Sequence, residues 1–160
     1  MAEKEKATII VFSGELDKAM AALNVAIGAA SMEMDVTMFF TFWGLNVIKK
    51  DKVGSKSKGI LKKMLNAMNR GGSRRLPLTH FNMAGMGPWM MKKLMKAAKF
   101  PSVGESLVLA HEMGVKFAAC TTSMGIMGLK KDAFIDEVDV YCGVASYLSE
   151  AKDSKVNLFI

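Results

Sequence analysis

Residues 7–42 decide the fold, because they hold two apolar runs separated by one helical pattern. The runs are Ala7-Thr-Ile-Ile-Val-Phe12 and Val36-Thr-Met-Phe-Phe-Thr-Phe42, both rich in the β-branched and aromatic residues that favour strands. Ser13-Gly14 ends the first run, and apolar residues then recur at helical spacing from Leu16 to Met34. Neither run alternates cleanly between apolar and polar residues, which is typical of strands covered on both faces. The stretch therefore predicts two parallel strands joined by a right-handed helical crossover.

Residues 101–160 continue this alternation of helix and strand. We expect a helix over 102–114, a strand over 115–119 that ends at Cys120, a helix over 121–134, a short strand or extended turn over 138–141, a helix over 143–151 and a terminal strand over 155–160. The 160 residues suit one domain. The pattern predicts a three-layer α/β/α fold over 1–160, with a mostly parallel sheet of about five strands.

The middle segment, 49–100, breaks the alternation and carries the positive charge of the chain. It has 14 basic residues and one acidic residue, whereas 1–48 and 101–160 each have a net charge of −3, so that the whole chain reaches +7. Seven of the 15 methionines also lie in this basic, Met-rich insert. We expect an amphipathic helix over 60–68, a strand within 76–87 before a glycine-rich loop, and a second amphipathic helix that opens at Pro88.

The methionines of the insert have two interpretations. They fill a core under the two helices, since methionine adapts to irregular gaps. Alternatively, they form an exposed, conformable docking surface. The lysines on the opposite helix faces are solvated, or they steer an acidic partner towards the protein.

Composition excludes several classes of protein. With 51% hydrophobic residues and 3 prolines, the chain is unlike a disordered or collagen-like protein. The apolar run Ala7–Phe12 is too short for the core of a signal peptide, and the run Val36–Ile48 is shorter than a transmembrane helix, so a cytoplasmic location is expected. No nucleic-acid-binding motif accompanies the positive charge, which argues against a nucleic-acid partner. The two cysteines are too few for a disulfide framework and are expected to be reduced.

Cys120 is the first candidate for chemistry, because it follows a predicted strand and precedes a predicted helix. Ligands of open α/β sheets bind at the carboxyl ends of the strands. Unpaired backbone N–H groups at a helix start favour a thiolate over a thiol, and the hydroxyls of Thr121, Thr122 and Ser123 can add donors. The alternative is a small buried thiol that closes an apolar strand.

The cysteine region is similar to a known motif. The run Ala119-Cys-Thr-Thr-Ser-Met-Gly-Ile-Met-Gly128 resembles the cysteine motif of the DsrE/DsrF-like family of sulfur-relay proteins, in the branch often labelled peroxiredoxin-like. Three further stretches resemble the same branch, namely Ile9–Ala19, Gly85–Met91 and Gly143–Leu148 with the strand after it. The resemblance spans essentially the whole chain.

The resemblance implies a compact α/β/α domain that is usually oligomeric and carries sulfane sulfur as a persulfide. That role falls on Cys120, with the backbone amides of Thr121, Thr122, Ser123 and Met124 stabilising the anion. Sulfur donor and acceptor proteins are the implied partners, together with a second copy of the chain. Such a carrier needs a thiolate but no metal and no cofactor. The resemblance assigns no role to Cys142.

Other residues are candidates for the pocket around the thiol. They are Ser13, Gly14, Trp43, His80, Gly87 and Trp89, which lie in predicted loops or just beyond predicted element ends. Ser13-Gly14 lacks a phosphate-loop pattern and is interpreted as a turn and helix cap. His111 shares a helix face with Leu107 and Val108, so a partly buried, hydrogen-bonded histidine is expected there. The histidines and cysteines lack zinc-site spacing.

Two further hypotheses compete with sulfur transfer. In the first, the chain is a non-catalytic adaptor whose basic, Met-rich helices dock an acidic partner or a membrane surface; it fails if those helices pack fully in the core. In the second, Cys120 and Cys142 perform thiol redox chemistry, which requires their Cα atoms to lie closer than about 7 Å.

Overall fold

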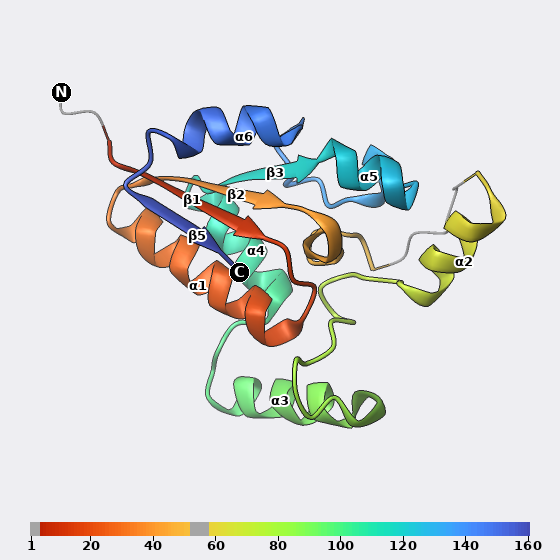
Figure 1. Ribbon diagram of the computed structural model, residues 1–160. Helices are drawn as coiled ribbons and strands as arrows, with labels where there is room; N and C mark the ends of the chain where they lie inside the picture. Colours follow the sequence, from red (N-terminus) through yellow and green to blue (C-terminus); the bar gives the residue numbers. More distant parts are fainter. Residues whose placement is uncertain (1–3, 52–57) are drawn as a thin grey trace.

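A computed structural model describes residues 4–51 and 58–160, so that residues 52–57 of the basic insert lie outside the described part (Figure 1). Five strands of the described chain form one sheet in the order β4-β3-β2-β1-β5, and every neighbouring pair is parallel. The strands are β1 (Lys6–Val11), β2 (Asp35–Phe40), β3 (Lys116–Cys120), β4 (Val140–Cys142) and β5 (Val156–Phe159). The expected parallel α/β architecture is confirmed.

Six α-helices accompany the sheet in the described residues. They are α1 (Leu16–Ser31), α2 (Ile60–Met68), α3 (Met86–Ala97), α4 (Val103–Glu112), α5 (Thr121–Met127) and α6 (Val144–Ala151). Three short 3-10 helices lie between them: η1 (Phe42–Asn46), η2 (Met83–Gly85) and η3 (Lys131–Ala133). Pro88 is the third residue of α3, where its missing N–H costs no helical hydrogen bond.

Helices cover both faces of the sheet. Helices α1 and α4 lie on one face and α6 lies on the other (Figure 1). The larger core, under α1 and α4, includes Ile9, Leu23 and Phe117. A smaller cluster under α6 joins Phe39 to Tyr147, whose rings stack with 4.9 Å between centroids. Because β4 precedes α6 and β5 follows it, α6 crosses the sheet from one edge to the other.

Three sequence predictions of local structure are wrong. The segment 76–87 contains no strand, and its Pro77 carbonyl instead accepts a hydrogen bond from the Leu16 N–H at 2.7 Å. The helix expected over 121–134 stops at Met127, because Gly128 adopts the left-handed conformation with φ 67°. The second strand ends at Phe40 rather than Phe42, since the chain turns into η1 there.

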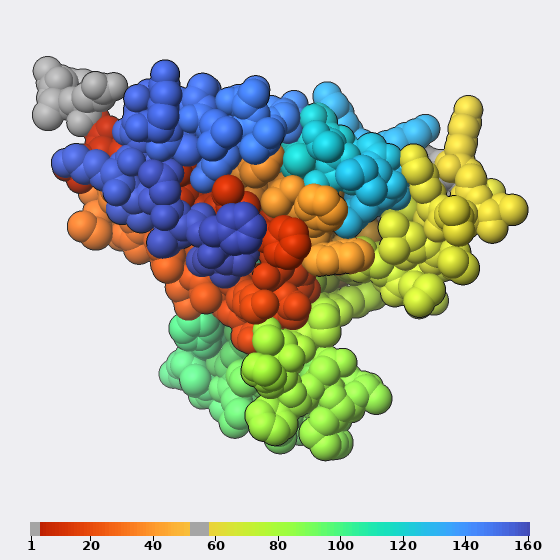
Figure 2. Space-filling view, in the orientation of Figure 1, coloured from red at the N-terminus to blue at the C-terminus, as the bar shows by residue number. Residues whose placement is uncertain are grey.

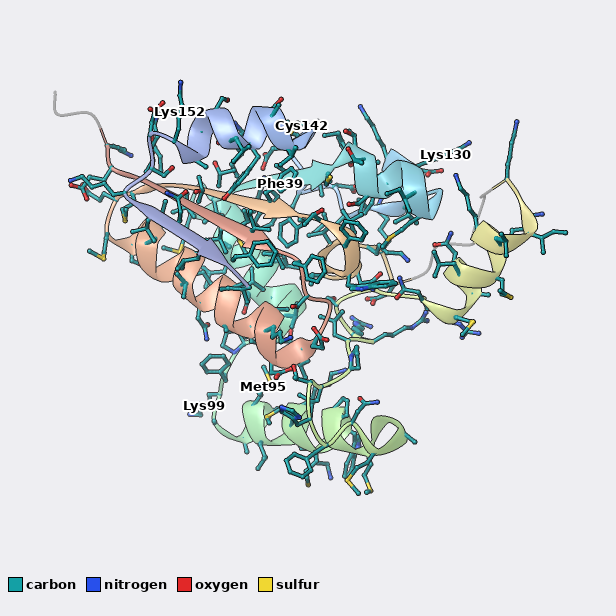
Figure 3. The ribbon with its side chains drawn as sticks, in the orientation of Figure 1. Phe39, Met95, Lys99, Lys130, Cys142 and Lys152 are labelled. Carbon is teal, nitrogen blue, oxygen red and sulfur yellow. The ribbon has the colours of Figure 1, made fainter. Side chains whose placement is uncertain are left out.

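The core-filling interpretation of the insert methionines is also wrong. Six of the seven methionines in 49–100 are exposed, and the partly buried one, Met95, packs against the core. Figure 3 shows Met95 between α3 and the body of the protein. Helix α2 buries none of its residues, and α3 buries only Gly87 and Pro88. The two helices extend from the body of the protein, with α2 beside α5 and α3 beyond α1 (Figure 2).

Candidate functional site

Cys120 ends β3 and is the residue that precedes α5. Strands β2 and β3 pair with Phe40 opposite Ala119, so that Thr41 and Cys120 follow side by side at the carboxyl edge of the sheet. Thr41 immediately precedes η1 and has an extended backbone conformation. The sheet register therefore brings a hydroxyl from one strand end next to a thiol from its neighbour.

The Cys120 sulfur receives hydrogen bonds from both sides. Burial raises the pKa of Cys120, but hydrogen bonds to the sulfur lower it. The donors are the N–H and the hydroxyl of Ser123, the hydroxyl of Thr41 and the N–H of Thr122. The net pKa lies below the ordinary value of a cysteine. These donors stabilise a negative charge on sulfur. Helix α5 has seven residues, so the named donors rather than a long helix dipole carry this effect.

The two hydroxyls also contact each other. Thr41 Oγ1 and Ser123 Oγ lie 2.9 Å apart, and either atom can be the donor. Since each hydroxyl has one proton, only one of the two donates to the sulfur while the other donates to its neighbour, and either hydroxyl can take either role. The pair therefore forms a short hydrogen-bonded chain that ends at Cys120.

Apolar residues surround the thiol on the α6 side of the sheet. Cys120 is 5% exposed and packs with Phe39, Ala118 and Tyr147. Figure 3 shows Phe39 on this side, between the sheet and α6. The exposed methionines of the insert do not belong to this cluster. A partly desolvated site strengthens each hydrogen bond to the thiolate.

Sequence reasoning found part of this site and missed part of it. Ser123 and Thr122 are among the predicted donors, whereas Thr121 is exposed and Met124 packs its side chain into the larger core. Thr41 was not among the predicted site residues. The signal that could have found it is its position just after the second parallel strand, at the same sheet edge as Cys120.

Gly14, just after β1, lies against the backbone of Trp43 in η1. A Cβ on Gly14 would lie 2.6 Å from the Trp43 carbonyl oxygen, so glycine permits η1 to lie against the end of β1. The Ser13 N–H donates to the carbonyl of Ile160 at 3.3 Å, and the Trp43 side chain is exposed. Strand β2 separates Ser13 and Gly14, which follow β1, from β3, whereas Trp43 belongs to η1, the segment just after Thr41.

His80, Gly87 and Trp89 belong to the segment that leads into α3. The residue before His80, Thr79, donates its N–H and its hydroxyl to Asp17 of α1, each at 3.0 Å. Gly87 is buried against the Phe81 carbonyl, while His80 and Trp89 are exposed. Figure 1 places α3 beyond α1, on the opposite side of the sheet from α6. The structure therefore does not bring these three residues to Cys120.

Cys142 is the direct neighbour of Cys120 across the sheet. Strands β3 and β4 pair in parallel with Cys120 opposite Cys142. Neighbouring strands lie about 4.8 Å apart, which meets the distance requirement of the thiol redox hypothesis. Burial raises the pKa of Cys142, and the negative charges of Glu150 and Cys120 raise it further, outweighing the opposing effect of Lys116. The two thiols thus differ in their tendency to ionise.

His111 is partly buried, as expected, and its Nε2 lies 3.1 Å from Oδ1 of Asp139. Asp139, which directly precedes β4, also accepts a hydrogen bond from the Phe117 N–H of β3 at 2.8 Å. Asp139 therefore links His111 to both strands. Across residues 4–51 and 58–160, no three side chains of His, Cys, Asp or Glu are grouped to hold a metal ion.

Removing a hydroxyl donor is expected to raise the pKa of Cys120. In Ser123→Ala and Thr41→Val, the thiolate loses a hydrogen bond while its burial persists. The pH midpoint of iodoacetamide alkylation, which follows the thiolate, should move upward in both variants, and alkylation near neutral pH should slow several-fold. Thr121→Ala, which removes an exposed neighbouring hydroxyl, is the control with an unchanged midpoint. Unchanged midpoints in all three variants would show that the hydroxyls do not control ionisation.

Comparisons with known proteins identify relatives of the chain in sequence and in fold. The chain is 42% identical to the uncharacterized protein YrkE of Bacillus subtilis, over 99% of this chain and 98% of that protein. It is 32% identical to the sulfur carrier protein DsrE2 of Allochromatium vinosum, over 99% of both chains. The crystal structure of the ychN protein of E. coli superposes with a TM-score of 0.60 at 11% identity, covering 98% of this chain and 99% of that one, which shows a shared fold. The family described as DsrE/DsrF/DrsH-like matches residues 3–159, and the chain belongs to that family.

Proposed function

We propose that this protein is a sulfur carrier that accepts sulfane sulfur on Cys120 as a persulfide and passes it to an acceptor thiol. The observation that carries the proposal is the set of donors from Thr41, Thr122 and Ser123 that lowers the pKa of Cys120. The relative named sulfur carrier protein DsrE2 supports the same chemistry. The donor protein, the acceptor protein and assembly into a homo-oligomer stay predictions.

The transfer consists of two thiol exchange steps. The Cys120 thiolate attacks the outer sulfur of a donor persulfide, an S–S bond forms to Cys120, and the donor leaves as its thiolate. An acceptor thiolate then attacks the outer sulfur on Cys120, and Cys120 leaves as its thiolate. The same donors serve both steps, because Cys120 carries negative charge before the first and after the second. A leaving group of lowered pKa also departs faster.

A persulfide donor tests this function. The protein is incubated with glutathione persulfide, quenched with iodoacetamide and mapped by mass spectrometry of its peptides. We expect one added sulfur atom on the peptide that contains Cys120, and its loss when a small thiol acceptor is then supplied. A protein in which Cys120 stays unmodified at every time point would exclude the proposed role.

The exposed helices of the insert favour a second function, docking to an anionic membrane surface. Helices α2 and α3 expose large apolar side chains, including Ile60 at 85%, Met68 at 81% and Trp89 at 58%. Lysines flank these apolar faces, and Lys93 lies 4.4 Å over the Trp89 ring. A basic amphipathic helix with tryptophan is typical of helices that lie in a lipid interface. None of the helices within the described ranges 4–51 and 58–160 has the length and apolarity to cross a bilayer.

Sedimentation with lipid vesicles tests this docking. We expect binding to vesicles with anionic lipid, weaker binding at high salt, and none to purely zwitterionic vesicles. The double variant Lys93→Glu/Lys96→Glu should bind at least roughly thirtyfold more weakly, since each basic residue near an anionic surface contributes about 1 kcal/mol and the introduced carboxylates are repelled by it.

Two variants separate docking from other effects. Lys152→Glu/Lys155→Glu changes the net charge equally, but both residues are exposed and follow α6, away from α2 and α3 (Figure 3), and this variant should bind like the parent protein. Cys120→Ser should also bind normally, because the thiol is buried outside these helices. Equal weakening by both double variants would mean that net charge alone drives binding, without a docking surface on α3.

A further inference from the structure

Two thiols lie next to each other at one edge of the sheet. Strand β4 is an edge strand, and its last residue, Cys142, pairs in register with Cys120, the last residue of β3. Register partners on neighbouring parallel strands point to the same side of the sheet, with about 4.8 Å between strands. Their common side is the one covered by α6, because both cysteines belong to the cluster of Phe39 and Tyr147.

The two thiols differ in access. Cys120 is buried at 5% exposure, whereas Cys142 is partly exposed. A carrier must present its sulfur to a thiol on another molecule, and Cys142 lies on the outer strand, closer to solvent. In Figure 3, Cys142 lies near the start of α6, above the end of β3.

The two thiols also differ in the groups that surround them, which shift their pKa values in opposite directions. The Cys120 sulfur is surrounded by donors from Thr41, Thr122 and Ser123, which suits it to hold negative charge and to act as a leaving group. Burial raises the pKa of Cys142, and the negative charge of the Glu150 carboxylate raises it further. A thiolate of higher pKa is intrinsically more nucleophilic. Glu150 is itself held by Lys116 at 2.9 Å and by the Thr37 hydroxyl at 2.8 Å.

We propose that Cys142 is a second sulfur-bearing thiol, which takes the sulfane sulfur from Cys120 and presents it at the edge of the sheet. This inference rests on the proposed function of Cys120 as a persulfide carrier. It gives Cys142 a role in sulfur transfer, which the family resemblance does not assign to it.

The step balances without an added oxidant or reductant. The Cys142 thiolate attacks the outer sulfur of the protonated Cys120 persulfide, a Cys142 S–S bond forms, and the bond between the outer sulfur and Cys120 Sγ breaks. The Cys120 thiolate leaves with the electron pair and keeps its hydrogen bonds to Ser123 and Thr122, while the proton stays on the transferred sulfur. No sulfide is released, and the oxidation state of the transferred sulfur is unchanged.

A time course of sulfur position tests the inference. The full-length protein is loaded with a less than equimolar amount of glutathione persulfide, quenched with iodoacetamide at intervals and mapped by mass spectrometry. We expect the added sulfur on Cys120 first and on Cys142 later, with one sulfur per chain. In Cys142→Ser, Cys120 should still load, but transfer to reduced glutathione should slow several-fold. In Cys120→Ser, neither position should load.

Different results overturn different conclusions. If Cys120 loads and releases sulfur while Cys142 never carries it, and Cys142→Ser transfers at the parent rate, the inference fails and the carrier function stands. If a Cys120–Cys142 disulfide forms with release of sulfide, Cys142 attacks the inner sulfur and is not a carrier. Loading of Cys142 in Cys120→Ser overturns the transfer between them. If neither cysteine loads in the parent protein, the proposed function fails as well.

A second substitution guards against a change in folding. Cys142→Ala is compared with Cys142→Ser by urea unfolding, and the slower transfer must appear in both variants at equal loading of Cys120. If the two variants differ in transfer but match in loading, the hydroxyl of the serine rather than the missing thiol causes the effect, which contradicts the inference.

Discussion

The Cys120→Ser variant is expected to take up no sulfane sulfur and to reduce transfer to an acceptor thiol to the rate without protein. A serine hydroxyl stays protonated at neutral pH, so the donors of Thr41, Thr122 and Ser123 have no anion to stabilise. The nucleophile of the first exchange step is therefore lost. Serine has nearly the size of cysteine and can accept the same hydrogen bonds, so the fold should persist. Persulfide mapping and the rate of transfer to reduced glutathione measure the effect.

Two controls accompany that substitution. Thr121→Ala changes an exposed residue next to Cys120 and should load and transfer at the parent rate. Urea unfolding of Cys120→Ser should give a free energy of unfolding within about 1 kcal/mol of the parent protein, as for most conservative changes. Transfer by Cys120→Ser at the parent rate would show that another group carries the sulfur.

Gly44→Ala is expected to destabilise the protein by about 3 kcal/mol or more. A Cβ at Gly44 would lie 1.8 Å from the Val11 carbonyl oxygen, so the backbone of η1 or of β1 must move. The Gly44 N–H also donates to Phe12 at 2.7 Å and to Thr41 at 2.9 Å, and movement weakens both bonds. Overpacking against backbone costs 1–3 kcal/mol and more where nothing can give way. Urea unfolding measures the loss.

A matched glycine provides the control. Gly28 lies in the interior of α1, and a Cβ there would meet nothing within 4 Å. Gly28→Ala should stabilise the protein by roughly 0.5–1 kcal/mol, because alanine loses less backbone entropy than glycine in a helix. If Gly44→Ala were as stable as Gly28→Ala, the backbone of η1 would not lie against the Val11 carbonyl of β1. Since Thr41 immediately precedes η1, Gly44→Ala should also lower the alkylation rate of Cys120.

The apolar runs predicted the sheet well, because strands buried on both faces must be apolar throughout. Strands β1, β2 and β3 follow Ala7–Phe12, Val36–Phe42 and 115–119 closely. The prediction failed at Gly128, where a left-handed residue ends α5, and within 76–87, where an apolar segment packs without pairing. At Gly128 a single backbone conformation overrides the local helix propensity, and within 76–87 contacts with distant residues override the local strand propensity.

The insert shows a different limit of sequence reasoning. Its amphipathic pattern predicted helices over 60–68 and from Pro88, and both are present as α2 and α3. The pattern could not tell whether the apolar face of each helix is covered by the rest of the protein, because periodicity defines an apolar face but not what packs against it. The structure leaves the apolar faces of both helices largely exposed, and this exposure is the basis of the second proposed function, surface docking.

The sequence by itself determined the parallel α/β fold, the family and the place of Cys120 at a strand-to-helix junction, because these depend on patterns that are contiguous in the chain. Only the tertiary structure decided which groups meet that thiol. Thr41 lies 79 positions before Cys120 and Cys142 lies 22 after it, yet the register of β2, β3 and β4 places all three side by side. Strand pairing joins residues irrespective of their separation in sequence, so the donors that lower the pKa of Cys120 and its neighbouring thiol emerge only when the sheet forms.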